Sequence, residues 1–260
     1  SAGQARIAVV GKYPSLVDSY KSIEEALIHG GIANDVKVTT EWLSSEHFDE
    51  KQAIESLTEY DGLLIPGGFG PRGVEGMLEA IRWARENQMP FFGICLGLQC
   101  AVIEFARNVC GLEESHSSEF AEGSADPVIC LLDSHLQVTS KGGTMRLGAY
   151  PCELAKGTRG REIYGESAIS ERHRHRFEVN NHYRETLTEH GLTISGTSPD
   201  GALVEMVEIT DHPWFISGQF HPELKSRPTR PHPLFASFVK AAAHYSAEGS
   251  TLKVTEPVSA

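Results

Sequence analysis

The sequence lacks several features that would assign it to a class of proteins at once. It contains no CxxC pair, no internal repeat and no Gly-Lys-Ser/Thr phosphate-binding signature. No apolar run approaches the roughly 20 residues that a membrane-spanning helix needs. Positive charge is also scarce, because 23 Lys and Arg face 35 Asp and Glu and leave a net charge of -12. We therefore expect no nucleic-acid partner and no membrane partner.

Cysteine occurs five times, at uneven spacing. An odd number without a recognisable signal peptide favours reduced thiols over a disulfide framework, and so predicts a cytoplasmic location. The length of 260 residues is enough for one large α/β domain with a complete core. We expect residues 6–245 to form this domain, residues 1–5 to be a linker remnant, and residues 246–260 to be a disordered tail.

Short apolar strands alternate with helical patterns in the first hundred residues. Such alternation predicts an α/β fold with a mainly parallel central sheet flanked by helices. Three later strands predict an antiparallel extension of that sheet. The expected parallel strands are 6–11, 36–42, 61–66 and 90–94, the helices 19–29, 51–59, 73–87, 98–107 and 233–245, and the antiparallel strands 194–197, 203–209 and 214–217.

Cys95 lies between a predicted buried strand and a predicted helix, with Gly93 and Gly97 on either side. A reactive side chain flanked by glycines at a strand-to-helix turn is the layout of a nucleophile elbow. The helix N-terminus places backbone N–H groups beside the sulfur and favours the thiolate. A buried structural cysteine is the alternative, but the flanking glycines favour a nucleophile.

A thiolate nucleophile needs a general base that a third group orients. His221 and Glu223 follow the last predicted strand, and side chains two residues apart in an extended chain point the same way. The carboxylate can therefore hold the imidazole in one tautomer. A solvated pair at a strand end is the alternative, which the Cys95 elbow makes the weaker interpretation.

The glycine-rich run Pro66–Gly70 follows the third predicted strand. It could be a flexible loop. It could also form an oxyanion hole, because glycines let backbone N–H groups turn toward a developing negative oxygen. Together with the N–H of Leu96, this run would supply two donors, each able to contribute roughly 3 kcal/mol to lowering the barrier.

Residues 108–191 have a less regular pattern. Strands are expected at 127–132 and 148–154, and a mobile loop at 132–143. The basic run Glu171–Phe177 could be a solvated face, a metal site built on His173 and His175, or a site that captures a carboxylate. No Cys or carboxylate repeats nearby at ligand spacing, so we expect no metal. Bidentate binding by Arg favours the carboxylate.

Together these residues resemble the class I (triad) glutamine amidotransferases, and more narrowly the glutaminase domains of the CTP synthase family. The resemblance runs from about residue 6 to residue 243. It is carried by the segments Gly11–Tyr13, Asp18–Ser22, Pro66–Gly70, Gly70–Gly76, Gly93–Gln99, Ser118–Phe120, Gly142–Gly148, Glu171–Asn180 and Phe220–Glu223.

The resemblance implies a flavodoxin-like fold and a role for each site residue. Cys95 would be the nucleophile, His221 the base and then the acid, and Glu223 the group that orients His221. The oxyanion donors would be the N–H groups of Gly68 and Leu96, and residues 142–148 would form a lid. The implied substrate-binding residues are Gly67, Gly68, Phe69, Gln99, Glu119, Arg176 and Phe177. Free glutamine is a zwitterion, so a carboxylate and a guanidinium suit it.

The resemblance also implies hydrolysis of L-glutamine to glutamate and ammonia through a thioester intermediate. The ammonia would serve the ATP-dependent amination of UTP to CTP in pyrimidine biosynthesis, by an N-terminal synthetase domain that this sequence does not include. We expect no cofactor in this domain, and ATP, Mg2+ and the activator GTP in a full enzyme that is a homo-oligomer. The alternatives are a γ-glutamyl peptidase of the same fold and a non-catalytic scaffold domain.

Overall fold

Parallel strands form one half of a nine-stranded sheet in the computed structural model, which describes residues 3–12, 17–48, 51–131 and 145–254. Strands β2, β1, β3, β4 and β12 lie side by side in that order and run parallel. Their bounds are β1 Gly3–Gly11, β2 Val36–Ser44, β3 Gly62–Ile65, β4 Phe91–Ile94 and β12 Phe215–Gly218. The glycine run after β3 and the cysteine after β4 are therefore neighbours at one edge of the sheet.

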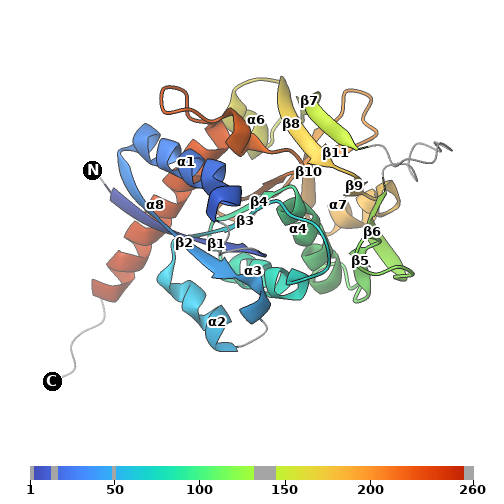
Figure 1. Cartoon of the computed structure of the whole chain (residues 1–260), viewed down its shortest axis with the longest axis horizontal. Coiled ribbons are helices and arrows are strands. Elements are labelled where there is room, and N and C mark those ends of the chain that lie inside the picture. Colours follow the sequence, from blue (N-terminus) through green and yellow to red (C-terminus); the bar gives the residue numbers. More distant parts are fainter. Residues whose placement is uncertain (1–2, 13–16, 49–50, 132–144, 255–260) are drawn as a thin grey trace.

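Helices cover both faces of this parallel half (Figure 1). On one face, Leu27 and Phe235 pack in one core cluster with the strand residues Val9 and Leu64; on the other, helical residues such as Met77 join a second cluster. The first layer consists of α1 Val17–Asn34 and α8 Pro233–Val254, and the second of α3 Val74–Glu86 and α4 Leu96–Asn108; α2 is Lys51–Glu55. The three layers confirm the predicted α/β fold.

Beyond β12 the sheet continues with antiparallel strands, which confirms the predicted extension. The order is β12, β11, β10, β7, β8. The bounds are β11 Val204–Ile209, β10 Leu192–Thr197, β7 Arg146–Leu154 and β8 Ala168–His175, with short helices α6 Arg159–Tyr164 and α7 Arg184–Glu189. A second sheet contains β5 Ser115–Ser117, β6 Asp126–Leu131 and β9 Phe177–Val179, and 3-10 turns lie at Ser45–His47, Ser56–Glu59, Asn181–Tyr183 and Pro222–Lys225.

Two expected boundaries were wrong. Gly3 already pairs with Val36 and Ala5 is fully buried, so residues 3–5 belong to β1 and not to a linker. At the other end, α8 runs to Val254 through nine residues of the expected tail. Extending a helix that is already packed costs little, because each added residue gains one backbone hydrogen bond. The loop expected at 132–143 and the first part of the expected lid lie outside the described residues.

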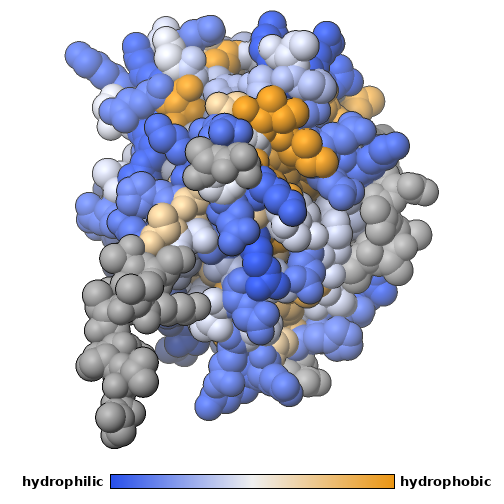
Figure 2. Space-filling model, turned by 90° about the vertical axis from the view of Figure 1, so that its left-hand side faces the viewer, coloured by the Kyte–Doolittle hydropathy of each residue, from blue (hydrophilic) through white to orange (hydrophobic). Residues whose placement is uncertain are grey.

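The side of the molecule with α1 and β2 carries an orange patch on a mostly blue surface (Figure 2). The exposed side chains of Ile28 and Ile32 on α1 line a groove there with Val36 and Val38 of β2. This groove lies beside the amino end of β2, whereas sites in parallel sheets form at the carboxyl ends of the strands.

Among the helices of the described residues, none has the length and apolar character needed to cross a membrane.

Candidate active site

Cys95 occupies a strained position between β4 and α4. Its backbone φ of 52° lies in the left-handed region, which residues other than glycine rarely adopt. The side chain of Cys95 is buried. The turn is closed on both sides. A Cβ on Gly93 would lie 2.5 Å from Ser217 Oγ, and a Cβ on Gly97 would lie 2.3 Å from the carbonyl oxygen of Ile65. The two glycines are thus required by close packing, as in a nucleophile elbow.

His221 lies next to Cys95, because its segment follows β12, which pairs with β4. A Cβ on Gly67 would lie 2.8 Å from His221 Cε1 and 3.6 Å from Cys95 Cβ, so both side chains border the same point. Backbone contact also fixes the base, because the N–H of His221 donates to the carbonyl of Arg172 on β8 at 2.7 Å. The structure therefore brings together the two groups that the sequence placed 126 positions apart.

The carboxylate of Glu223 orients the imidazole, with Oε1 2.8 Å from His221 Nδ1. Since Nδ1 is committed to Glu223, Nε2 is the ring nitrogen left to interact with Cys95, and it has no partner in full hydrogen-bond geometry among the described residues. Burial lowers the pKa of His221, but the interactions with Cys95 and Glu223 outweigh it and raise the pKa to about 11. The folded protein thus favours an imidazolium beside the sulfur.

Lys12, the residue that follows β1, holds the glycine run after β3 in place. The buried Lys12 ammonium donates to the carbonyl of Phe69 at 3.0 Å and to the carbonyl of Gly70. Burial lowers the pKa of Lys12. Because the carbonyls of Phe69 and Gly70 are bound to Lys12, they do not point into the cavity.

Gly68 lies against Leu96, since a Cβ on Gly68 would be 3.2 Å from Leu96 Cδ2. Leu96 is the first residue of α4, where helix geometry leaves backbone N–H groups without an intrahelical acceptor. The two expected oxyanion donors therefore come from neighbouring segments beside Cys95.

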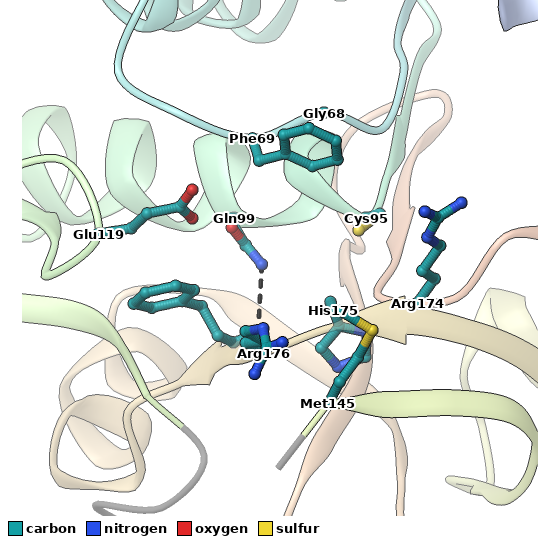
Figure 3. A pocket seen from close by; sticks show the side chains of 10 residues that line it. Gly68, Phe69, Cys95, Gln99, Glu119, Met145, Arg174, His175 and Arg176 are labelled. Atoms are coloured by element: carbon teal, nitrogen blue, oxygen red, sulfur yellow. Dashed lines mark hydrogen bonds between the residues drawn. The ribbon is translucent and has the colours of Figure 1, made fainter. Parts of the chain in front are cut away.

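A cavity of about 360 Å3 opens at Cys95. Figure 3 shows the Cys95 sulfur and the Gln99 amide between Phe69 on one side and Arg176 on the other. Glu119 reaches the rim and accepts a 2.8 Å hydrogen bond from the N–H of Gly70. The cavity is lined by Gly68, Phe69, Cys95, Gln99, Glu119, Met145, Arg174, His175, Arg176 and Phe177. All the expected substrate-binding residues except Gly67 line it, and Gly67 contacts His221 at its inner end.

The basic run forms most of β8 and alternates between two environments. Arg172, Arg174 and Arg176 are exposed, whereas His173 and His175 are buried. Both imidazoles face carboxylates: His175 Nε2 lies 2.7 Å from Glu178 Oε1, and His173 Nε2 lies 3.3 Å from Glu205 Oε2. The buried guanidinium of Arg146 contacts the same two carboxylates, at 3.1 and 2.7 Å.

The run is therefore not a uniformly solvated face, because both of its imidazoles are buried against carboxylates. Among the residues that the structure describes, no group of three or more His, Cys, Asp or Glu could hold a metal ion. Arg174 of β8 and Arg176, the residue that follows the strand, both line the cavity.

Sequence reasoning did not assign a role to two residues that contact the site. Lys12 supports the glycine run, and Gln219 lies 3.7 Å from Cys95 Sγ. A signal existed for each. Lys12 follows a parallel strand at its carboxyl end, where sites form, and Gln219 precedes His221 by two residues in extended chain.

Comparison with known proteins places this geometry in a family. The family model of class I glutamine amidotransferases matches residues 15–241. The CTP synthase of Clostridium perfringens is 60% identical over 237 residues, which are 91% of this chain and 44% of that protein. The CTP synthase of Geobacter sulfurreducens is 56% identical over 240 residues, 92% of this chain and 45% of that protein. The chain thus spans less than half the length of these curated relatives.

Among solved structures, the CTPS glutaminase domain of Trypanosoma brucei, with bound acivicin, matches with a TM-score of 0.87 and 38% identity. The match covers 92% of this chain and 94% of that domain. The chain therefore has the fold of nearly the whole of that glutaminase domain. The chain belongs to the class I glutamine amidotransferase family, and within that family to the glutaminase domains of CTP synthases.

Proposed function

We propose that this chain hydrolyses L-glutamine to glutamate and ammonia, with Cys95, His221 and Glu223 as the catalytic triad. One observation carries the proposal: the strained Cys95 borders His221 at the inner end of a cavity whose rim holds both a carboxylate, Glu119, and a guanidinium, Arg176. These two charges suit the ammonium and carboxylate of a free amino acid, and the depth of the cavity directs its side-chain amide toward the sulfur.

The reaction proceeds in two halves. The Cys95 sulfur attacks the amide carbon and forms the C–S bond, while the N–H groups of Gly68 and Leu96 stabilise the oxyanion. His221 then gives its proton to the departing nitrogen, and the C–N bond breaks to release ammonia. In the second half, His221 accepts a proton from water, the hydroxide attacks the thioester, and the C–S bond breaks to release glutamate. Atoms balance as glutamine plus water giving glutamate plus ammonia.

The ammonia would pass to an N-terminal synthetase domain that aminates UTP with ATP. What supports this part is the 60% identity to a CTP synthase that is more than twice as long. In that full enzyme we expect Mg2+ to accompany ATP, GTP to act as an activator, and the chain to assemble as a homo-oligomer. A protein that carries both parts would show ATP- and UTP-dependent consumption of glutamine, and a glutamine turnover indifferent to both nucleotides would count against this coupling.

Ammonia release by the purified chain tests the glutaminase proposal. Wild-type protein should release ammonia from L-glutamine, and Cys95→Ala should abolish the release. Acivicin, which is bound in the Trypanosoma brucei relative, should form an adduct that peptide mass spectrometry locates at Cys95. Cys110 is half-buried and serves as the internal control thiol. Ammonia release that persists in Cys95→Ala, or labelling mainly at Cys110, contradicts the proposal.

The same assay separates the two alternatives. Hydrolysis of a γ-glutamyl peptide that is faster than hydrolysis of free glutamine would assign the site to a peptidase. Wild-type protein that releases no ammonia and takes up no electrophile at Cys95, even with a synthetase partner present, would indicate a scaffold domain.

A further inference from the structure

The side chain of Gln219 lies against the sulfur of Cys95. Gln219 Nε2 is 3.7 Å from Cys95 Sγ, within the range of an N–H···S hydrogen bond, and Gln219 is fully buried. The mechanism above makes no use of this contact. A donor at this distance matters for the reaction, because hydrogen bonds to charged groups are stronger than those between neutral groups, and more so where water is excluded.

The backbone holds Gln219 at this place. Gln219 follows β12 directly, and its N–H donates to the carbonyl of Glu205 on β11 at 2.9 Å. Side chains two residues apart in extended chain point the same way. Gln219 and His221 therefore both approach the sulfur from one segment, while Phe220 between them is buried against His173.

Neighbouring groups determine which end of the Gln219 amide faces the sulfur. Gln99 Nε2 lies 3.2 Å from the carbonyl oxygen of Phe177. A carbonyl oxygen only accepts, so this end of Gln99 must be its NH2 group. The atom of Gln219 that faces the same NH2 group at 3.5 Å must therefore be the oxygen, Oε1. This leaves the NH2 group of Gln219 directed at Cys95.

We propose that Gln219 is a further catalytic residue, whose side-chain amide donates a hydrogen bond to the Cys95 sulfur. The bond stabilises the thiolate before it attacks and again when the thioester breaks and the sulfur leaves. Gln219 exchanges no proton and forms no covalent bond in either step. The proposal deepens the glutaminase proposal and rests on Cys95 being its nucleophile.

The test measures the reactivity of the Cys95 thiol directly. Wild type, Gln219→Met and Gln219→Glu are alkylated with iodoacetamide at neutral pH, and labelling of each cysteine is followed by mass spectrometry. Methionine keeps the volume of the side chain but donates no hydrogen bond, so alkylation of Cys95 should slow about 10- to 100-fold. Glutamate keeps the shape of glutamine and places a carboxylate beside the sulfur, so alkylation should slow further.

Two controls accompany these variants. Asn34→Leu removes a side-chain amide that donates to Gly30 and Ala236 at 2.7 and 2.8 Å, far from the cavity, and should leave Cys95 labelling unchanged. Cys100 and Cys152 are fully buried, so their labelling reports unfolding in any variant. During glutamine turnover, the γ-glutamyl thioester should accumulate in Gln219→Met, because the sulfur leaves more slowly without its donor.

Labelling of Cys95 at the wild-type rate in Gln219→Met, with Cys100 and Cys152 still protected, would overturn the proposal. Should Gln219→Met expose those two thiols, Gln219→Glu decides the question by the same criterion. Failure of the glutaminase proposal gives a different result: wild-type Cys95 is then not labelled in preference to Cys110, and Cys95→Ala still releases ammonia.

Discussion

His221 and Glu223 lie two residues apart in the chain, and the imidazole Nδ1 is 2.8 Å from the carboxylate Oε1. Glu223→Gln keeps the shape of the side chain and removes its charge. Because general acid–base catalysis typically contributes 10²- to 10⁴-fold, we expect ammonia release to fall by at least about tenfold. Steady-state kinetics with glutamine would show the loss in kcat, and an unchanged kcat would remove Glu223 from the triad.

The same substitution should change stability in a pH-dependent way. The pKa of His221 is about 11 in the folded protein, against about 6.5 for histidine in the unfolded chain. The stability that the charged imidazole contributes is therefore complete below about pH 6.5 and is lost as the pH rises toward 11. Urea denaturation should show a larger stability difference between wild type and Glu223→Gln at pH 6 than at pH 9.5. A difference that grows with pH would contradict this assignment.

Gly97→Ala should destabilise the elbow. The added Cβ would lie 2.3 Å from the backbone carbonyl of Ile65, which cannot move without disturbing β3. Overpacking of this kind typically costs about 1–3 kcal/mol, and thermal denaturation would measure it. Gly3→Ala is the matched control, because its new Cβ would meet only Val36, at 3.8 Å. Equal melting temperatures for the two variants would show that the turn around Cys95 accommodates an added Cβ, which would contradict the prediction.

Lys12→Met should lower kcat more than it raises KM for glutamine. The substitution keeps the apolar stem and removes the ammonium that holds the carbonyls of Phe69 and Gly70. Loss of one oxyanion donor costs about 10²- to 10³-fold in kcat, and a misplaced glycine run should cost part of that, about tenfold. Lys37→Met on the exposed part of β2 is the control. A change confined to KM would indicate that Lys12 supports binding alone.

Glu119→Gln should raise KM for glutamine with little change in kcat. The amide oxygen can still accept the hydrogen bond from the N–H of Gly70, so the glycine run stays in place. What is lost is the negative charge proposed to pair with the substrate ammonium, worth about 1.5–3 kcal/mol or roughly 10- to 100-fold in KM. A glutamine analogue without the α-amino group should bind wild type and Glu119→Gln with equal affinity. Tighter binding of that analogue by wild type would argue against a contact between Glu119 and the substrate ammonium.

Glu205 should make stability fall as the pH rises from about 4.5 to about 7. Burial raises its pKa to about 7, while Arg146 acts in the opposite direction. A carboxyl group whose pKa is higher in the folded state favours folding when protonated, so wild type should lose stability between about pH 4.5 and pH 7. Glu205→Gln removes this titration and should flatten the profile of denaturation midpoint against pH. The exposed Glu153→Gln is the control, and a profile that stays steep in Glu205→Gln would exclude Glu205 as its cause.

Features set by local spacing could be predicted from the sequence. The glycines around Cys95 and the two-residue interval between His221 and Glu223 are each determined within a few positions, and the structure places them as expected. Alternating strands and helices likewise predict a parallel sheet, because parallel strands need helical crossovers.

Features set by tertiary contact could not be predicted in the same way. Lys12 gains its partners only when β1 and β3 become neighbours. The small sheet of β5, β6 and β9 contains two strands of three residues, too short for a periodic signal. The pairing of Gly3 with Val36 depends on β2 and not on the composition of the first residues. Each of these three features is determined by contacts between residues that are distant in the chain.

Strand β8 and the residue that follows it connect the general base to the wall of the cavity. The carbonyl of Arg172 holds the N–H of His221, and Arg176, four residues later, borders the cavity. A change that shifts this strand to admit a longer or bulkier amide would also displace the imidazole. Protein engineers who wish to alter what the pocket accepts should therefore begin at Phe69 or Met145, whose side chains line the same cavity from segments that do not anchor the base.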